Sequence, residues 1–71
     1  MTEETKKKVR ELIQREADMH KIALEYKATS QTLDADFHEV AEEYRLSAQH
    51  FADGAKLCAE RVSSLIKNAA S

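Results

Sequence analysis

Each of the three histidines in this chain has a carboxylate within one helical turn, which makes these pairs the first candidates for metal or acid-base chemistry. The pairs are Glu16 with His20, His38 with Glu42, and His50 with Asp53. A di-metal carboxylate bundle needs several glutamates and Glu-x-x-His pairs that project inward from different helices, and no Glu-x-x-His occurs here. Ordinary ion pairs along a helix explain the spacings, so we predict no metal and no cofactor.

The single cysteine, Cys58, is the only candidate thiol nucleophile. It falls in an apolar row, where a free cysteine packs as a small apolar side chain. The sequence contains no phosphate-binding Gly-rich loop, and its spacings bring together no nucleophile, base and orienting group. We therefore predict no catalytic residues and a protein that is not an enzyme.

The composition favours helices. The chain has 71 residues, of which 42% are hydrophobic and 34% charged, with no proline and one glycine. A core this small supplies only a few kcal/mol, and one cysteine cannot form an internal disulfide, so self-association is the expected aid. The chain lacks both the ~18 apolar residues of a membrane span and the apolar core of a secretory signal, which predicts a cytoplasmic protein with no membrane partner.

The predicted architecture is all-α, with one domain over residues 1–71 that forms an antiparallel helical hairpin. We expect a first helix over about 3–30 with Thr2 as its N-cap, a turn over about 30–35, and a second helix over about 35–68, capped by Thr32 or Asp34. The Thr and Ser residues from Thr29 to Thr32 weaken the helix there. They favour the hairpin over a single continuous rod, which the sequence leaves open.

The second helix carries the strongest pattern, an apolar row at alternating spacings of four and three, as in a heptad coiled coil. Bulky residues alternate with mostly small ones, so a neighbouring backbone can approach closely beside the alanines. Gly54, at the edge of the row, marks a close approach or a bend. We call this row the seam, and it comprises Phe37, Ala41, Tyr44, Ala48, Phe51, Ala55, Cys58, Val62, Leu65 and Ala69.

The first helix carries two adjoining apolar stripes that cover more than half of its circumference. The expected core residues are Val9, Leu12, Ile13, Met19, Ile22, Ala23 and Tyr26, with Ala17 and Leu24 beside them. One partner helix needs only about 100° of apolar surface, so we predict a second neighbour. A second copy would give a four-helix bundle or a higher oligomer, and a different protein could also complete the bundle.

Polar and surface residues suggest further contacts. In a symmetric bundle, two Glu16 and His20 pairs would form a partly buried polar layer that fixes register or makes assembly pH-sensitive. Opposite charges at the two ends of the hairpin favour head-to-tail packing of two copies. A candidate partner surface comprises Leu46, His50, Leu57 and Arg61. Candidate phosphate contacts are Lys7, Lys8, Arg10, Arg15 and Lys21, although Glu11 and Asp18 interrupt them.

Three families resemble parts of this plan. The residues Leu33-Asp-Ala-Asp36 at the turn, with the small and large layers from Ala41 to Cys58, resemble the plasmid-encoded Rop hairpin dimers, which implies RNA binding. In size and hairpin form the chain is similar to co-chaperones of type III secretion needle subunits, which work in a heterocomplex. His50-Phe-Ala-Asp-Gly54 and Val62 resemble the helical phage sponges that sequester cyclic nucleotides.

The prediction for function is a small non-enzymatic helical adaptor or regulatory protein, which acts by protein-protein contacts through a homo-oligomeric bundle, with a dimer favoured. The alternatives are a Rop-like RNA-binding dimer, an oligomeric nucleotide sponge, or a co-chaperone that completes a heteromeric bundle. The net charge of −2 makes nucleic acid the less favoured partner.

Overall fold

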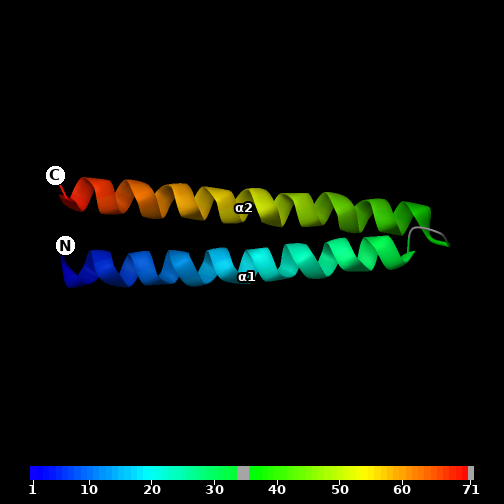
Figure 1. The fold of residues 1–71 in the computed structure, drawn as a ribbon, viewed down its shortest axis with the longest axis horizontal. Helices are drawn as coiled ribbons and strands as arrows, with labels where there is room; N and C mark the ends of the chain where they lie inside the picture. Colours follow the sequence, from blue (N-terminus) through cyan, green and yellow to red (C-terminus); the bar gives the residue numbers. More distant parts are fainter. Residues whose placement is uncertain (34–35, 71) are drawn as a thin grey trace.

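The protein is a hairpin of two long helices. The computed structural model describes residues 1–33 and 36–70, with α1 over Glu3–Leu33 and α2 over His38–Ala70. The helices pack side by side and antiparallel, so the N and C termini lie at the same end (Figure 1). The predicted all-α hairpin is therefore confirmed, and the continuous rod is excluded.

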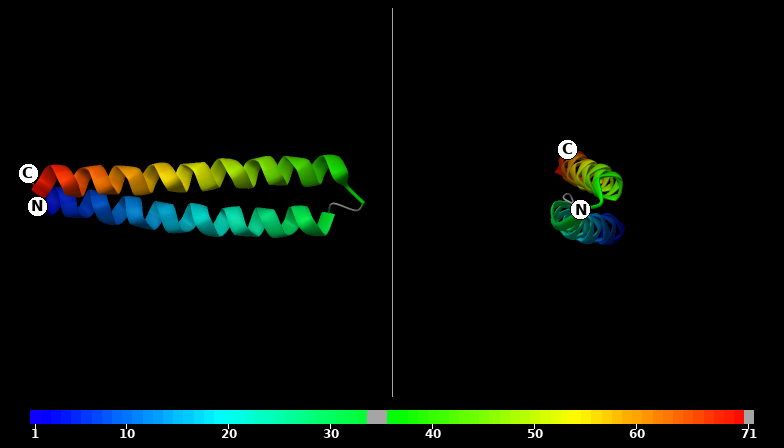
Figure 2. Two further views of the ribbon diagram at one scale, coloured as in Figure 1. Left: turned by 45° about the horizontal axis from the view of Figure 1, so that its top comes forward. Right: turned by 90° about the vertical axis from the view of Figure 1, so that its right-hand side faces the viewer.

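The hairpin is a single elongated layer. Its radius of gyration is 16.1 Å, whereas a compact chain of this length has about 11 Å. Its principal extents are 53 × 15 × 11 Å, and the end-on view in Figure 2 shows the two helices with nothing stacked on either broad side. Each helix therefore packs against one neighbour and leaves most of its circumference uncovered.

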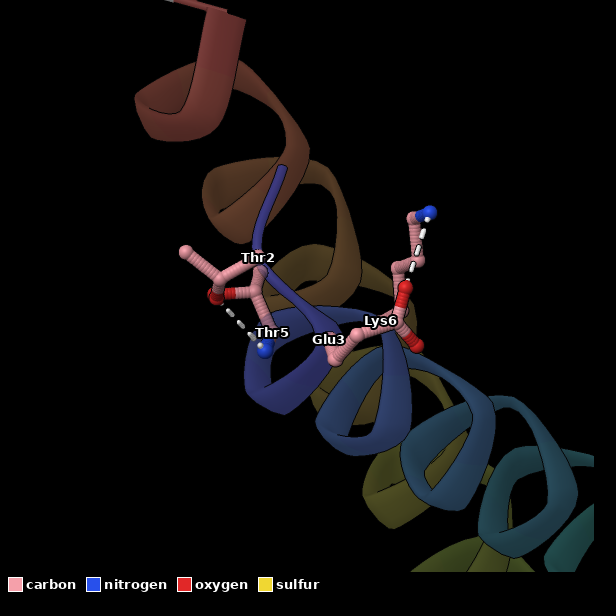
Figure 3. Close-up of polar contacts among 4 residues, drawn as sticks. All are labelled: Thr2, Glu3, Thr5 and Lys6. Carbon is pink, nitrogen blue, oxygen red and sulfur yellow. Dashed lines mark hydrogen bonds and ion pairs between the residues drawn. The ribbon is translucent and has the colours of Figure 1, made fainter.

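Thr2 caps α1 as predicted. The Thr5 backbone N–H donates to the Thr2 Oγ1 at 3.1 Å (Figure 3), and the Lys6 backbone N–H donates to the Thr2 carbonyl at 3.0 Å. Glu3 lies in the first turn, where the helix dipole favours negative charge, and its carboxylate is 3.3 Å from the Lys6 ammonium. The first residues of α1 thus supply hydrogen-bond acceptors for two N–H groups at the start of the helix.

The turn lies about three residues later in the chain than predicted, because α1 extends to Leu33 instead of ending near residue 30. Three hydroxyls donate to carbonyls of the preceding helical turn: Thr29 to Glu25, Ser30 to Lys27, and Thr32 to Ala28. These bonds keep the hydroxyl residues within the helix, so they do not open it. Thr32 consequently does not cap α2, and Asp34 lies outside the described residues.

The start of α2 is also later than predicted, at His38 and not near residue 35, and the helix continues to Ala70. The Phe37 carbonyl accepts the N–H of Ala41 at 2.8 Å, which places Phe37 at the N-cap position. The N–H groups of Asp36 and Phe37 both donate to the Leu33 carbonyl, at 3.2 and 2.8 Å. One carbonyl at the end of α1 therefore holds the chain as it enters α2.

Small residues of the seam pack directly against α1. Ala41 and Ala55 are fully buried, and Ala48 and Cys58 are also buried. At Gly54 an added Cβ would lie 2.9 Å from the Met19 sulfur, so the expected close approach is confirmed. The alanine row of α2 is thus the surface on which the two helices meet.

On α1 the residues that face the seam repeat at the same alternating spacings of four and three. Every one of them is buried or half-buried: Thr5, Val9, Leu12, Glu16, Met19, Ala23, Tyr26, Ser30 and Leu33. Three of them are polar, and Ser30 is only 2% exposed. Five members of the row were predicted as core residues from the sequence, and the half-buried position of Thr5 and the buried position of Ser30 were not.

The second apolar stripe of α1 does not pack on α2. Ile13 was expected in the core but is 51% exposed, and Leu24 is 69% exposed. Both lie off the row that faces the seam, and α2 is wide enough to cover only that row. Ile13, expected in the core of the first helix, therefore lies outside the contact between the two helices of the hairpin.

Candidate assembly interface

The bulky side chains of the two facing rows gather on one broad side of the hairpin. Tyr26 of α1 makes edge-to-face contacts with Tyr44 and Phe51 of α2, with ring centroids 5.3 and 5.6 Å apart. All three rings are half-buried. The small residues fill the space between the helix axes, and this geometry pushes the large ones outward to one side.

This side continues beyond the three rings. Val40 lines a shallow hollow with Tyr26 and Tyr44, and it is 43% exposed. Leu57 follows Gly54 by three residues on the same helix face and is 65% exposed. We call this surface the aromatic face, and its apolar members are Met19, Ile22, Tyr26, Val40, Tyr44, Phe51 and Leu57.

The aromatic face is an incomplete core. Among residues 1–33 and 36–70, no large side chain is fully buried. Burying a large apolar side chain contributes about 1.5–3 kcal/mol, and half-exposed rings realise only part of that. The hairpin thus leaves its largest apolar groups on an open surface.

The opposite broad side has a different character. In an antiparallel pair of helices, equivalent flanking positions lie on the same side of the pair. The residues that follow the seam alanines of α2 by four positions, and the equivalent residues of α1, therefore share this side. It carries Ile13 and Ile66, which are 51% and 45% exposed, and the half-buried Ala52 and Ala59. We call it the cationic face, because its charged residues include Lys6, Arg10, Lys27, Arg45 and Lys56.

Most residues of the predicted partner surface lie toward the aromatic face. Arg61 lines a pocket with Leu12, and the ring of His50 lies 6.2 Å from that of Phe51. Leu57 belongs to the aromatic face itself, whereas Leu46 lies on the outer edge of α2 and is 63% exposed. Three of the four residues therefore lie toward the aromatic face, and Leu46 adjoins His50 on the outer edge of α2, one helical turn away.

The five predicted phosphate contacts do not form one surface. Lys8 and Arg15 line a shallow pocket of about 190 Å³ together with Arg61 of α2, and Glu11 contributes a carboxylate to the same pocket. Arg10 lies on the cationic face, while Lys7 and Lys21 lie on the outer edge of α1. Arg61 is the member of this basic group that the sequence did not place there, because it comes from the other helix.

Glu16 and His20 are neighbours, as predicted, but they are not equally buried. The Glu16 side chain lies in the row that faces the seam and is 28% exposed, whereas the His20 side chain is 60% exposed. The His20 Nε2 is 3.9 Å from a Glu16 carboxylate oxygen. Within one hairpin, the pair therefore runs from the seam to the edge of the cationic face.

Over the part of the chain that the structure describes, no group of three or more His, Cys, Asp or Glu side chains is arranged to hold a metal ion. Neither helix combines the length and apolarity required to cross a membrane. Comparison of the chain with protein-family models, curated proteins and solved structures finds no match. Function must therefore be inferred from the two faces of the hairpin.

Proposed function

We propose that the chain is a non-enzymatic adaptor or regulatory protein of the cytoplasm, whose working form is a homodimer. In this proposal the aromatic faces of two hairpins pack together into a four-helix bundle, and the bundle acts through protein-protein contacts. The observation that carries the proposal is the position of the aromatic side chains, which lie half-exposed on one side, while Leu12 is the largest of the residues buried in the hairpin interior.

The dimensions of the hairpin support the proposal. A broad side of 53 by 15 Å covers about 800 Å², which is the area that each partner contributes to a standard protein interface. A second copy presents the same rings and aliphatic groups, so a twofold interface is self-complementary in chemistry. Assembly would bury the aromatic groups that one hairpin leaves open.

Two leucine substitutions on α2 test the proposal. Leu57→Glu puts a charge on the aromatic face, and Leu46→Glu puts the same charge on the outer edge of the same helix. The two leucines are 65% and 63% exposed, so neither substitution disturbs the hairpin interior. Light-scattering mass, measured with circular dichroism on the same samples, reports assembly and helicity together.

We expect the wild type and Leu46→Glu to have a mass near twice 8.1 kDa. We expect Leu57→Glu to be dimeric only at concentrations at least about tenfold higher, because the dimer would bury an unpaired charge. A monomeric wild type with full helicity would overturn the proposal. Equal effects of the two substitutions would show that the aromatic face is not the interface.

A further inference from the structure

We propose that the cationic face binds an acidic amphipathic helix of a partner protein. This proposal deepens the protein-binding function proposed above, because it names the chemistry of the partner. It rests on that function in one respect: dimerisation through the aromatic face leaves the opposite side of each hairpin open.

The cationic face has an excess of positive charge that the whole chain lacks. It holds five Lys and Arg residues but two carboxylates, Glu3 and Glu42, whereas the net charge of the chain is −2. Both carboxylates already pair within the face, Glu3 with Lys6 and Glu42 with Arg45. The electrostatic complement of this surface is therefore an acidic one.

Three further cations of the face are exposed and available. Arg10, Lys27 and Lys56 have no ion-pair partner within residues 1–33 and 36–70. A partner carboxylate would meet each of them without breaking an existing pair. A rim of this kind sets orientation and the rate of association more than it sets affinity.

The middle of the face is apolar and supplies the area for affinity. Ile13 and Leu24 stand exposed on α1 between Arg10 and Lys27, and Ala52 and Ala59 lie half-buried on α2. An apolar centre with a charged rim is the usual anatomy of a protein interface. An amphipathic helix that lies along the hairpin with its apolar side on this centre fits the surface.

The arrangement also indicates the length of the partner helix and argues against nucleic acid. Arg10 and Lys27 are separated by about 26 Å along α1, at 1.5 Å per residue. A helix that pairs with both needs carboxylates about 17 residues apart and apolar residues between them. A phosphate backbone carries charge along its whole length, so an apolar centre would face several unpaired phosphates.

The test uses the full chain and a fluorescent synthetic peptide as the probe. The peptide is a helix of three heptads with leucine and alanine on one face and glutamates in its first and last turns. A control peptide has lysines in place of those glutamates. Fluorescence anisotropy at low and moderate salt measures both affinities.

We expect the acidic peptide to bind at least about tenfold more tightly than the lysine peptide, with an affinity that falls as salt is raised. Arg10→Glu combined with Lys27→Glu should weaken this binding by about tenfold or more. Lys7→Glu combined with Lys21→Glu makes the same change of charge on the outer edge of α1 and should leave the affinity within about twofold.

Equal loss in both double variants would overturn the proposal, because it would reflect net charge alone. Tighter binding of a single-stranded RNA or of anionic lipid vesicles than of the acidic peptide would also overturn it.

Light-scattering mass is recorded for every variant. If Arg10→Glu with Lys27→Glu lowers the mass, the cationic face is an interface between copies and the proposal fails. If the wild type is monomeric but binds the peptide, only the proposed dimer fails.

Discussion

Gly54 of α2 lies directly against the Met19 side chain of α1. Gly54 lies inside α2 with no positive φ, so the position does not require the conformational freedom of glycine. What glycine provides is space, because an added Cβ would lie 2.9 Å from the Met19 sulfur. That sulfur belongs to the far end of a flexible side chain, which can move.

At this residue we predict that Gly54→Ala stabilises the protein. Alanine is favoured over glycine inside a helix by about 0.5–1 kcal/mol, and a small shift of Met19 offsets part of this gain. In a Met19→Ala background the gain should approach the full value, about 1 kcal/mol. Urea unfolding followed by circular dichroism, at one protein concentration, measures both. Destabilisation in both backgrounds would mean that backbone, and not the thioether, occupies the space.

Polar residues in the row of α1 that faces the seam show why residue type alone does not predict burial. Ser30 is nearly fully buried because its hydroxyl donates to the Lys27 carbonyl at 2.8 Å, which satisfies it locally. A residue type alone does not reveal such a bond. Glu16 is tolerated in the same row because 28% of its side chain remains in contact with solvent.

At the scale of the helix, the ends are determined by hydrogen bonds that short segments make for themselves. Thr2 caps α1 in the way its type and position predicted. The Thr and Ser residues near the end of α1 behave differently, because their hydroxyls donate to carbonyls of the preceding turn from positions within the helix. Equal residue types therefore serve as a cap at one end and as helix interior at the other.

The prediction at this scale concerns the N-cap. Thr2→Ala should cost about 1 kcal/mol and should speed amide exchange in the first turn of α1, because the Thr5 N–H loses its acceptor. Thr32→Ala is the matched control. Its hydroxyl bonds to the Ala28 carbonyl within the helix, so stability should change by less than about 0.5 kcal/mol. Amide hydrogen exchange locates the effect, and equal losses in the two variants would contradict the assignment of the cap.

At the scale of the molecule, charge gives the proposed dimer a direction. The aromatic side carries three cations near the termini, Lys8, Arg15 and Arg61, with Glu4 and Glu11 among them. Toward the turn its charged residues are the carboxylates Glu25 and Glu43. Head-to-tail packing therefore places unlike charges together, whereas packing with both turns at one end places carboxylates against carboxylates.

We predict the head-to-tail arrangement, which energy transfer between labelled chains can measure. In a Cys58→Ala background, one chain carries a donor at Thr32→Cys and the other an acceptor at Asn68→Cys, and transfer should be strong. Transfer between two chains labelled at Thr32→Cys should be weak, because those sites would lie near opposite ends of a 53 Å molecule. The reverse result would show parallel hairpins.

The sequence alone determined the two helices, the N-cap of α1 and the seam of α2. These follow from helix propensity and from the repeat of apolar residues along one helix. Both can be assessed from one segment of the sequence, without knowledge of contacts between distant residues. The seam was clear because all ten of its members are apolar. In α1 the corresponding row was predicted only in part, because the polar residues Thr5, Glu16 and Ser30 interrupt it.

Only the tertiary structure decided which surface is core and which is open. Ile13 and Val9 are both apolar residues of α1, yet Val9 is buried and Ile13 is half-exposed. The difference arises because α2 covers a single row of α1, and the register between two helices depends on contacts between residues distant in the chain. The grouping of Arg61 with Lys8 and Arg15, and the separation of an aromatic from a cationic face, have the same origin. Both result from packing two helices in one antiparallel layer, which no single helix specifies.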